Sequence, residues 1–302
     1  MFMDSQITEA QYSDLNAMGF FPSKEESRDS FFERVKHSLD WSEKLKNEDF
    51  RFEESKYILP QQNRLSSEEL EAAGLHAKKA YNLLPSWIPA YYLNQGLPLL
   101  TGGMAIHFRS EKEGPWFSFF QLKEVFKNKK KWILYTAEEI VSHEMCHISR
   151  GPLHSTRYEE NLAYKISSSP VRRYLGGALV NYYDSFILLF SLAFIFLFDF
   201  MCFFSPSLMT FQWCGKCPFM IILTLGLIRN HNIRRELKAA EEKLKLIFPL
   251  NYREILIRLD DQDILNVGQL SINGLEQWWH DIPCFRGEFL RNIYHPESPV
   301  NP

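Results

Sequence analysis

One apolar run constrains the fold of this chain more than any other feature of its sequence. Residues 186–204 read FILLFSLAFIFLFDFMCFF, in which Asp199 is the single charged residue. A helix of this length and composition can cross the hydrocarbon core of a bilayer. A second apolar stretch covers residues 209–228 and is interrupted by Lys216. We therefore expect a transmembrane helical hairpin over residues 178–228, whose second arm either spans the bilayer or is re-entrant or interfacial.

The charges around the hairpin predict its orientation. The loop between the two arms holds only Lys216, whereas the open side is flanked by Arg172, Arg173, Arg229, Arg234 and Arg235. The positive-inside rule then places both soluble parts in the cytoplasm. The first nine residues lack the pattern of a cleavable signal peptide, and an odd number of cysteines is typical of a reducing compartment. We expect an integral membrane protein in which Asp199 lies at the far interface or pairs with Lys216 or with a partner subunit.

The soluble sequence on either side of the hairpin predicts an α+β fold. Residues 1–80 have apolar side chains at helical spacing and predict a helical N-terminal region, with a capping-box pattern at Ser66 and Glu69. Residues 81–175 predict the core domain with a small mixed or antiparallel sheet, and residues 229–302 predict a C-terminal helical region. The short strands are expected at residues 87–92, 104–108, 116–122 and 131–135. A net charge of −3 lacks the basic footprint of a nucleic-acid-binding protein, so we expect no nucleic-acid partner.

A helix predicted over residues 136–150 carries the most informative pattern of the chain. It is bounded by a capping-box pattern and a turn, formed by Thr136, Glu139, Gly151 and Pro152. Residues 143–147 read H-E-M-C-H, which is an H-E-x-x-H motif. Positions i and i+4 share one helix face, so His143 and His147 can bind the same metal ion. Glu144 then lies beside that metal.

This motif predicts a zinc site that hydrolyses peptide bonds. Zinc acts as a Lewis acid, which polarises the scissile carbonyl and lowers the pKa of a bound water. The carboxylate beside it can take a proton from that water and pass the proton to the leaving amine. We expect an oxyanion stabiliser near the zinc, and the sequence leaves Tyr158, Tyr164 and His154 as candidates.

A catalytic zinc site needs a third protein ligand, and the residues after the motif supply candidates. His154 is seven residues after the second motif histidine, whereas the metzincin pattern places the third histidine six residues after it. A second helix is predicted over residues 155–169, antiparallel to the first. Glu160 then lies level with His143 along the axes of the two helices, so Glu160 is the first candidate and Glu159 the second.

Glu236 is a further candidate, and it rests on a resemblance. The order of H-E-x-x-H, a membrane hairpin and the sequence R-R-E-x-x-A at residues 234–239 resembles the gluzincin-like membrane zinc peptidases of the CAAX-processing and heat-shock classes. In those families the Glu of E-x-x-A-D is the third metal ligand, which implies Glu236, although Ala240 stands in place of the Asp. Residues 160–163 also read E-x-x-A. The resemblance implies a zincin-like domain whose strand and active-site helix line the substrate cleft.

These patterns together predict a membrane-anchored, zinc-dependent metallopeptidase that acts on a protein or peptide substrate. Its zinc ligands are expected to be His143, His147 and Glu160, with Glu144 as general base. The alternative is a non-catalytic, membrane-anchored zinc-binding or scaffold protein. Glu144 favours the enzyme, because a structural metal site has no use for a base beside the metal.

Overall fold

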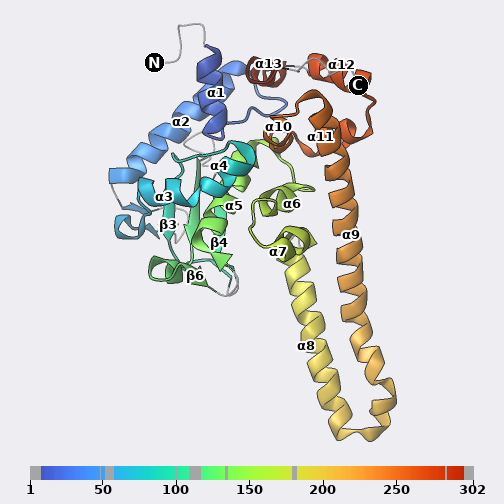
Figure 1. Cartoon of the computed structure of the whole chain (residues 1–302). Coiled ribbons are helices and arrows are strands. Elements are labelled where there is room, and N and C mark those ends of the chain that lie inside the picture. Colours follow the sequence, from blue (N-terminus) through green and yellow to red (C-terminus); the bar gives the residue numbers. More distant parts are fainter. Residues whose placement is uncertain are drawn as a thin grey trace.

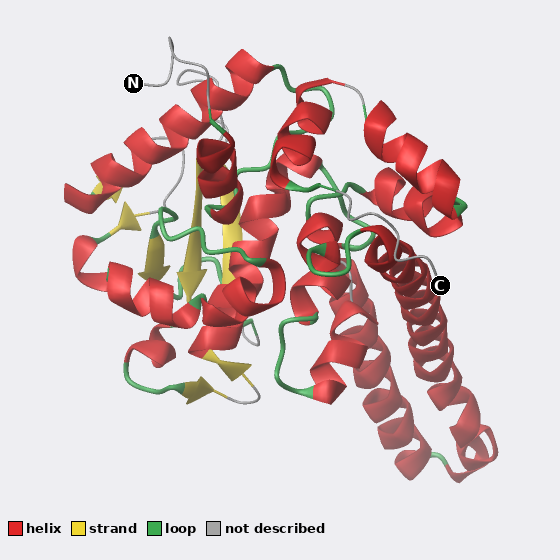
Figure 2. Ribbon diagram, turned by 45° about the horizontal axis from the view of Figure 1, so that its top comes forward, coloured by secondary structure: helices red, strands yellow, loops and turns green. Residues whose placement is uncertain are grey.

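Figure 1 shows a largely helical body from which one long pair of helices projects. The computed structural model describes residues 8–47, 49–51, 58–98, 101–108, 117–132, 135–178, 182–282 and 284–295. The described chain is mostly helical with small sheets, as the secondary-structure view in Figure 2 also shows. An α+β fold is compatible with this content of helices and strands.

The described part of the N-terminal region is mainly helical, as predicted. Its elements are α1 (Glu9–Ala17), α2 (Arg28–Asn47), β1 (Phe50–Arg51), β2 (Ile58–Leu59), α3 (Ser67–Ala73) and α4 (Leu75–Tyr81). The capping box at the start of α3 is confirmed, because Ser66 and Glu69 each accept a hydrogen bond from the other's backbone N–H, at 3.2 and 2.8 Å. The antiparallel pair β1–β2 was not predicted, since two residues per strand are too few to show an alternating pattern.

The core domain contains a small mixed sheet, which confirms the prediction of its size and type. Its strands are β3 (Ala90–Tyr92), β4 (Gly103–Phe108) and β5 (Phe117–Leu122), in the order β3-β5-β4. β5 pairs with β3 in parallel and with β4 in antiparallel register. The predicted strand over residues 131–135 is wrong: β6 (Lys131–Trp132) and β7 (Tyr135–Thr136) form a separate antiparallel pair. The helix with the H-E-x-x-H motif therefore follows a hairpin and not a strand of the main sheet.

The motif helix α5 (Ala137–Arg150) packs against this sheet. Its apolar side chains share a buried core with strands and with α3; this core includes Leu70, Ala90, Phe120, Leu122, Ile140, Val141, Met145 and Ile148. Burying one such large apolar side chain stabilises a fold by about 1.5–3 kcal/mol. Gly103 permits the close approach of β4 and α5, because a Cβ atom there would lie 2.4 Å from the side chain of Ile140. This packing fixes β4 alongside the motif.

The predicted capping box at the start of α5 is only half present. Thr136 Oγ1 accepts a hydrogen bond from the backbone N–H of Glu139 at 3.3 Å, as expected. The side chain of Glu139 instead accepts hydrogen bonds from the hydroxyl and backbone N–H of Ser168 and forms an ion pair with Arg172. Burial would raise the pKa of Glu139, but these hydrogen bonds and Arg172 outweigh it and lower the pKa. The first turn of α5 is therefore connected by side-chain contacts to residues 168–172.

The predicted second helix over residues 155–169 is wrong in its length. The short turn η3 (Gly151–Leu153) is followed by α6 (Glu159–Tyr164) and α7 (Pro170–Leu175). The carboxylate of Asp261 accepts hydrogen bonds from the backbone N–H groups of Thr156 and Arg157, which holds them outside a helix. The chain nevertheless reverses direction after α5, so that α6 packs against the motif helix.

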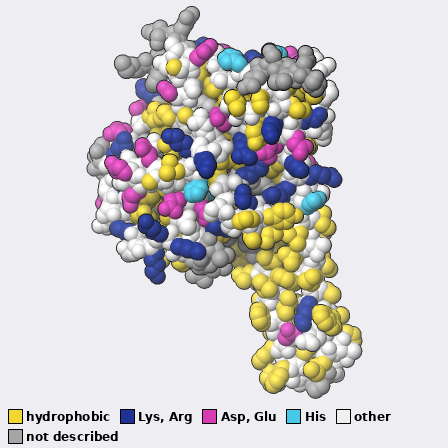
Figure 3. All heavy atoms as spheres, in the orientation of Figure 1, with side chains coloured by type: hydrophobic (Ala, Val, Ile, Leu, Met, Phe, Trp, Pro, Cys, Tyr) yellow, Lys and Arg dark blue, Asp and Glu magenta, His cyan; other side chains and the backbone are white. Residues whose placement is uncertain are grey.

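The projecting pair consists of α8 (Tyr182–Phe204) and α9 (Gln212–Ile247), joined by the turn η5 (Pro206–Phe211). Both helices are long and apolar enough to cross a membrane, and few of their apolar side chains are buried. Figure 3 shows the apolar surface of this hairpin. The second arm is one continuous 36-residue helix despite Pro218, and it extends beyond the expected hairpin limit into the C-terminal region. Near the turn, Asp199 accepts a hydrogen bond from Gln212 at 3.3 Å.

The C-terminal region is helical, as predicted. After α9 it contains α10 (Tyr252–Ile257), α11 (Asp261–Gln269), α12 (Ile272–Asp281) and α13 (Cys284–Ile293). These helices pack around the upper part of α9 in a core that includes Leu237, Leu244 and Trp279. α13 also contacts α1 through Phe285 and Phe289, which joins the two ends of the described chain.

Candidate metal centre

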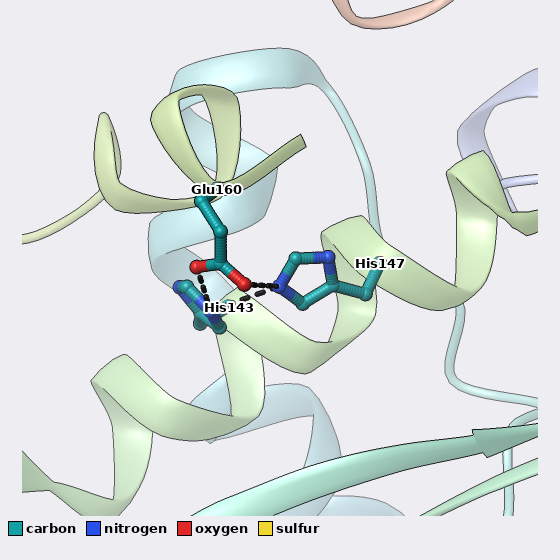
Figure 4. Close-up of side chains that lie close together, drawn as sticks. All are labelled: His143, His147 and Glu160. Carbon is teal, nitrogen blue, oxygen red and sulfur yellow. Dashed lines mark hydrogen bonds and ion pairs between the residues drawn. The ribbon is translucent and has the colours of Figure 1, made fainter. Parts of the chain in front are cut away.

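Two histidines of α5 and one glutamate of α6 converge on one point, as Figure 4 shows. The Nε2 atoms of His143 and His147 are 2.9 Å apart. Glu160 faces both rings: its Oε2 is 3.5 Å from Nε2 of His143, and its Oε1 is 3.5 Å from Nε2 of His147. The reversal of the chain after α5 therefore brings together the three residues that the sequence predicted as metal ligands.

These three side chains fit a divalent metal ion. In a tetrahedral zinc site with bonds of about 2.0–2.2 Å, the ligand atoms lie about 3.3–3.6 Å apart. The two histidine–glutamate separations of 3.5 Å match this spacing. The two ring nitrogens are closer, at the 2.9 Å of a hydrogen bond. The group could hold a metal ion, and its imidazole and carboxylate donors suit several divalent metals, zinc among them.

A buried ion pair lies behind His147. Nδ1 of His147 is 3.1 Å from Oε1 of Glu159, and Oε2 of Glu159 accepts a hydrogen bond from Nε of Arg150 at 2.7 Å. The Arg150 guanidinium also donates to the backbone carbonyls of Ile257 and Leu259. Glu159 therefore contacts the edge of the imidazole ring opposite the one that faces Glu160. A carboxylate in this position can orient a histidine that binds a metal, whereas Glu160 faces the Nε2 atoms of both histidines.

We expect Glu159→Gln to weaken metal binding by about 10–100-fold without abolishing it, because it removes the carboxylate that fixes the His147 ring. A competition titration against a chromophoric chelator, in detergent, measures this change. Glu236→Gln is the matched control and should retain wild-type affinity. Complete loss of metal binding in Glu159→Gln would instead make Glu159 a ligand.

The electrostatics of the centre favour a bound cation. Burial would lower the pKa of His147, but Glu160 and Glu159 outweigh it and raise the pKa to about 10. Burial would likewise raise the pKa of Glu159 and of Glu160, yet Arg150 and His147 lower the first, and His147 and His143 lower the second. Two ionised carboxylates therefore hold a proton on His147 when no metal is bound.

A metal must displace this proton, because a ligating imidazole is neutral. Near pH 7, well below the pKa of about 10 for His147, we expect binding to release about one proton per metal ion. The apparent affinity should therefore rise with pH. Calorimetric titration in two buffers of different ionisation enthalpy measures the released proton. A binding heat that does not depend on the buffer would contradict this expectation.

Glu144 lies between α5 and the sheet. It is 7% exposed, and its Oε2 accepts a hydrogen bond from the backbone N–H of Ala105 in β4 at 2.7 Å. Glu144 directly follows His143 in the sequence, and its charge is near enough to contribute to the raised pKa of His147. A carboxylate has a second oxygen, which can accept a proton.

Among the predicted oxyanion candidates, Tyr164 packs against a motif histidine. Its ring centroid is 4.5 Å from that of His143. Burial, followed by Tyr135 and Glu160, raises the pKa of Tyr164 far above its usual range, so its hydroxyl keeps its proton. Tyr158 donates its hydroxyl to Glu236 at 2.7 Å and lies in the C-terminal core. His154 has a left-handed backbone, with φ of 52°, at the end of η3.

Glu236, which the resemblance implied as third ligand, has other partners. Its carboxylate accepts two hydrogen bonds from Arg157, at 3.0 and 2.8 Å, and one from Tyr158. It is not part of the described metal-ligand group. Cys146, the residue before His147, lies instead in a buried apolar cluster with Tyr81 and Leu83.

His107 is a neighbour of the site that sequence reasoning missed. Burial and the proximity of His147 lower its pKa, and Nδ1 of its ring is 2.8 Å from the hydroxyl of Ser118. A Cβ atom on Gly151 would lie 2.9 Å from the His107 ring. The sequence signal that could have identified His107 is the alternation of side chains along β4. This alternation places residues 103, 105 and 107 on one face of the strand. Since Gly103 contacts α5, His107 belongs to the same face.

Comparison with known protein families, curated proteins and solved structures found no match. The likeness to membrane zinc peptidases therefore stays a prediction from the motifs. The case for a function rests on the residues and geometry of the metal centre.

Proposed function

We propose that this chain is a membrane-anchored zinc metallopeptidase that hydrolyses peptide bonds in a protein or peptide substrate. His143, His147 and Glu160 bind the zinc, and Glu144 is the general base. One observation carries the proposal: ligand atoms of the three side chains lie within 4.8 Å of one another, and the carboxylate of Glu144, which is hydrogen-bonded to β4, is near enough to act on the charge of His147. A structural metal site does not need a base in this position.

The residues of the chain divide the chemistry among them. Zinc, when bound, supplies a Lewis acid that polarises the scissile carbonyl. Glu144 takes a proton from the attacking water and passes it to the leaving amine. The N–H of Ala105 fixes one oxygen of Glu144, so the base is oriented before the reaction. Tyr164 is assigned as the donor to the carbonyl oxygen as negative charge develops there, and its raised pKa keeps the required proton in place.

We assign β4 as the strand along which the backbone of the substrate binds. This strand pairs with β5 on one side, while the N–H of Ala105 points to Glu144 on the other. An extended peptide can add to such an edge through main-chain hydrogen bonds, which position a peptide bond without requiring one particular side chain. An edge strand beside a motif helix is also the arrangement that a zincin-like domain would have, which supports the resemblance.

The hairpin supplies the membrane anchor in this proposal. Its two helices have the length and composition to span a bilayer, and side chains such as Phe196, which is 75% exposed, need an apolar environment. Arginines at the base of the hairpin support a cytoplasmic location for the body, by the positive-inside rule.

Cleavage of a mixed peptide library by the full chain in detergent, followed by mass spectrometry, tests the proposal. We expect peptide products that disappear with a zinc chelator and return when zinc is restored. Products that persist in the chelator would contradict metal-dependent hydrolysis. Zinc binding without any hydrolysis would instead support the non-catalytic scaffold.

A further inference from the structure

The short helix α7 carries an exposed apolar patch at the base of the hairpin. Val171, Tyr174 and Leu175 are 65%, 47% and 44% exposed. Figure 1 shows α7 where α8 joins the body. The patch therefore extends the apolar surface of the hairpin onto the body. Exposed apolar side chains that continue such a surface are expected at a membrane contact.

Arginines lie on α7 itself and on the part of α9 that contacts it. The guanidinium of Arg234 lies over the ring of Tyr174, 4.8 Å from its centroid, and donates a hydrogen bond to the carbonyl of Arg173. Arg173 itself is exposed on α7. Also on α9 are Arg229, which pairs with Asp184 at 2.6 Å, and Arg235, which directly follows Arg234 and is exposed. Figure 3 shows Lys and Arg side chains gathered on the body next to the apolar hairpin.

We propose that α7 lies flat in the headgroup region of the membrane that the hairpin crosses, and that the surrounding arginines bind anionic phospholipid headgroups. The two halves of this surface match the two layers of a membrane interface: the apolar side chains reach the acyl boundary, and the guanidinium groups remain at the phosphates. Tyrosine is also a residue that favours this boundary, because its ring is apolar and its hydroxyl is polar.

This membrane contact would fix the distance of the metal centre from the membrane surface. Arg172 of α7 forms an ion pair with Glu139 in the first turn of α5, and Glu139 also binds Ser168 just before α7. Helix α7 is therefore connected by side chains to the start of the helix that carries the motif histidines. A peptide bond bound at that centre would lie close to the membrane surface, which favours membrane-proximal segments as substrates. The position of α7 rests on the proposed membrane anchor, and this last step rests also on the proposed peptidase activity.

Thiol accessibility in lipid nanodiscs tests the position of α7. The parent chain has its exposed cysteines, Cys214, Cys217 and Cys284, replaced by serine. Leu175→Cys reports on α7, and Leu75→Cys is the matched control, because Leu75 is 58% exposed in α4, which lies higher in the body than α7 in Figure 1. Phe190→Cys, at a position 70% exposed in α8, reports on the hairpin. The labelling rate with a hydrophilic maleimide is divided by the rate of the same variant after denaturation.

We expect labelling at position 175 to be several-fold slower than at position 75, and position 190 to be protected. Equal rates at 175 and 75 with position 190 protected would overturn the proposal for α7 and leave the anchor intact. Rapid labelling at position 190 would overturn both the membrane anchor and the position of α7.

The lipid composition tests the arginines. Adding phosphatidylserine to phosphatidylcholine nanodiscs should slow labelling of Leu175→Cys further. This additional protection should disappear when Arg173→Glu and Arg235→Glu are introduced together. Protection that does not respond to phosphatidylserine would overturn the binding of anionic headgroups.

Discussion

Glu144→Gln is expected to lower the rate of peptide hydrolysis by about 10²–10⁴-fold, the contribution of a general base, while the metal stays bound. The amide has nearly the same shape as the carboxylate but cannot take a proton from water. Its oxygen can still accept the hydrogen bond from Ala105, so the packing between α5 and β4 should persist. Metal content and hydrolysis of the peptide library, measured on the same preparation, separate the two effects.

Glu138→Gln is the matched control for this variant, because Glu138 is an exposed carboxylate in the first turn of the same helix. It should leave both metal content and hydrolysis at the wild-type level. Hydrolysis by Glu144→Gln at the wild-type rate would show that another group is the base. Loss of the metal from Glu144→Gln would show that the role of Glu144 is to maintain the site.

Arg150→Met is expected to destabilise the fold by about 3–5 kcal/mol, because it leaves a buried charge without its partner. The side chain of Arg150 is fully buried and connects Glu159 of α6 with two backbone carbonyls, one at the end of α10 and one just after it. Methionine fills a similar volume but donates no hydrogen bond. Thermal unfolding in detergent, with a metal chelator present, measures the effect without a contribution from metal loss.

Arg157→Met is the matched control for stability. Arg157 also pairs with a glutamate, Glu236, but its side chain is 50% exposed. Exposed ion pairs contribute only about 0–1 kcal/mol, so this variant should unfold near the wild-type temperature. Similar melting temperatures for Arg150→Met and wild type would contradict the structural role assigned to the buried pair.

Local patterns predicted the parts of the fold that depend on nearby residues. The helix with the motif begins and ends where its N-cap Thr136 and the turn at Gly151 predict. The position of Glu160 also followed from local geometry, because a chain that reverses after α5 returns at the height of His143. The apolar runs predicted both helices of the hairpin, since their length and composition alone permit them to span a bilayer.

Contacts between distant residues decided what the sequence could not predict. Asp261 lies about a hundred residues after α6 in the chain, yet it binds the backbone N–H groups that would otherwise begin that helix earlier. Glu139 forms its ion pair with Arg172 and not the capping box that its spacing suggests. Likewise, the sequence ranked Glu160 ahead of Glu159 but did not predict the contacts of Glu159. Only the packing of α6 on α5 assigns one to the edge of His147 that faces Arg150 and the other to the metal-ligand group.

Metal content tests the central claim most directly. Elemental analysis of the detergent-purified chain should find about one zinc per chain, as a site with one set of ligands requires. The zinc should be lost in His143→Ala and Glu160→Ala and retained in Glu236→Ala, which lies outside the ligand group. A wild-type chain that holds no zinc, even after reconstitution, would contradict the account and leave the H-E-x-x-H motif without a metal.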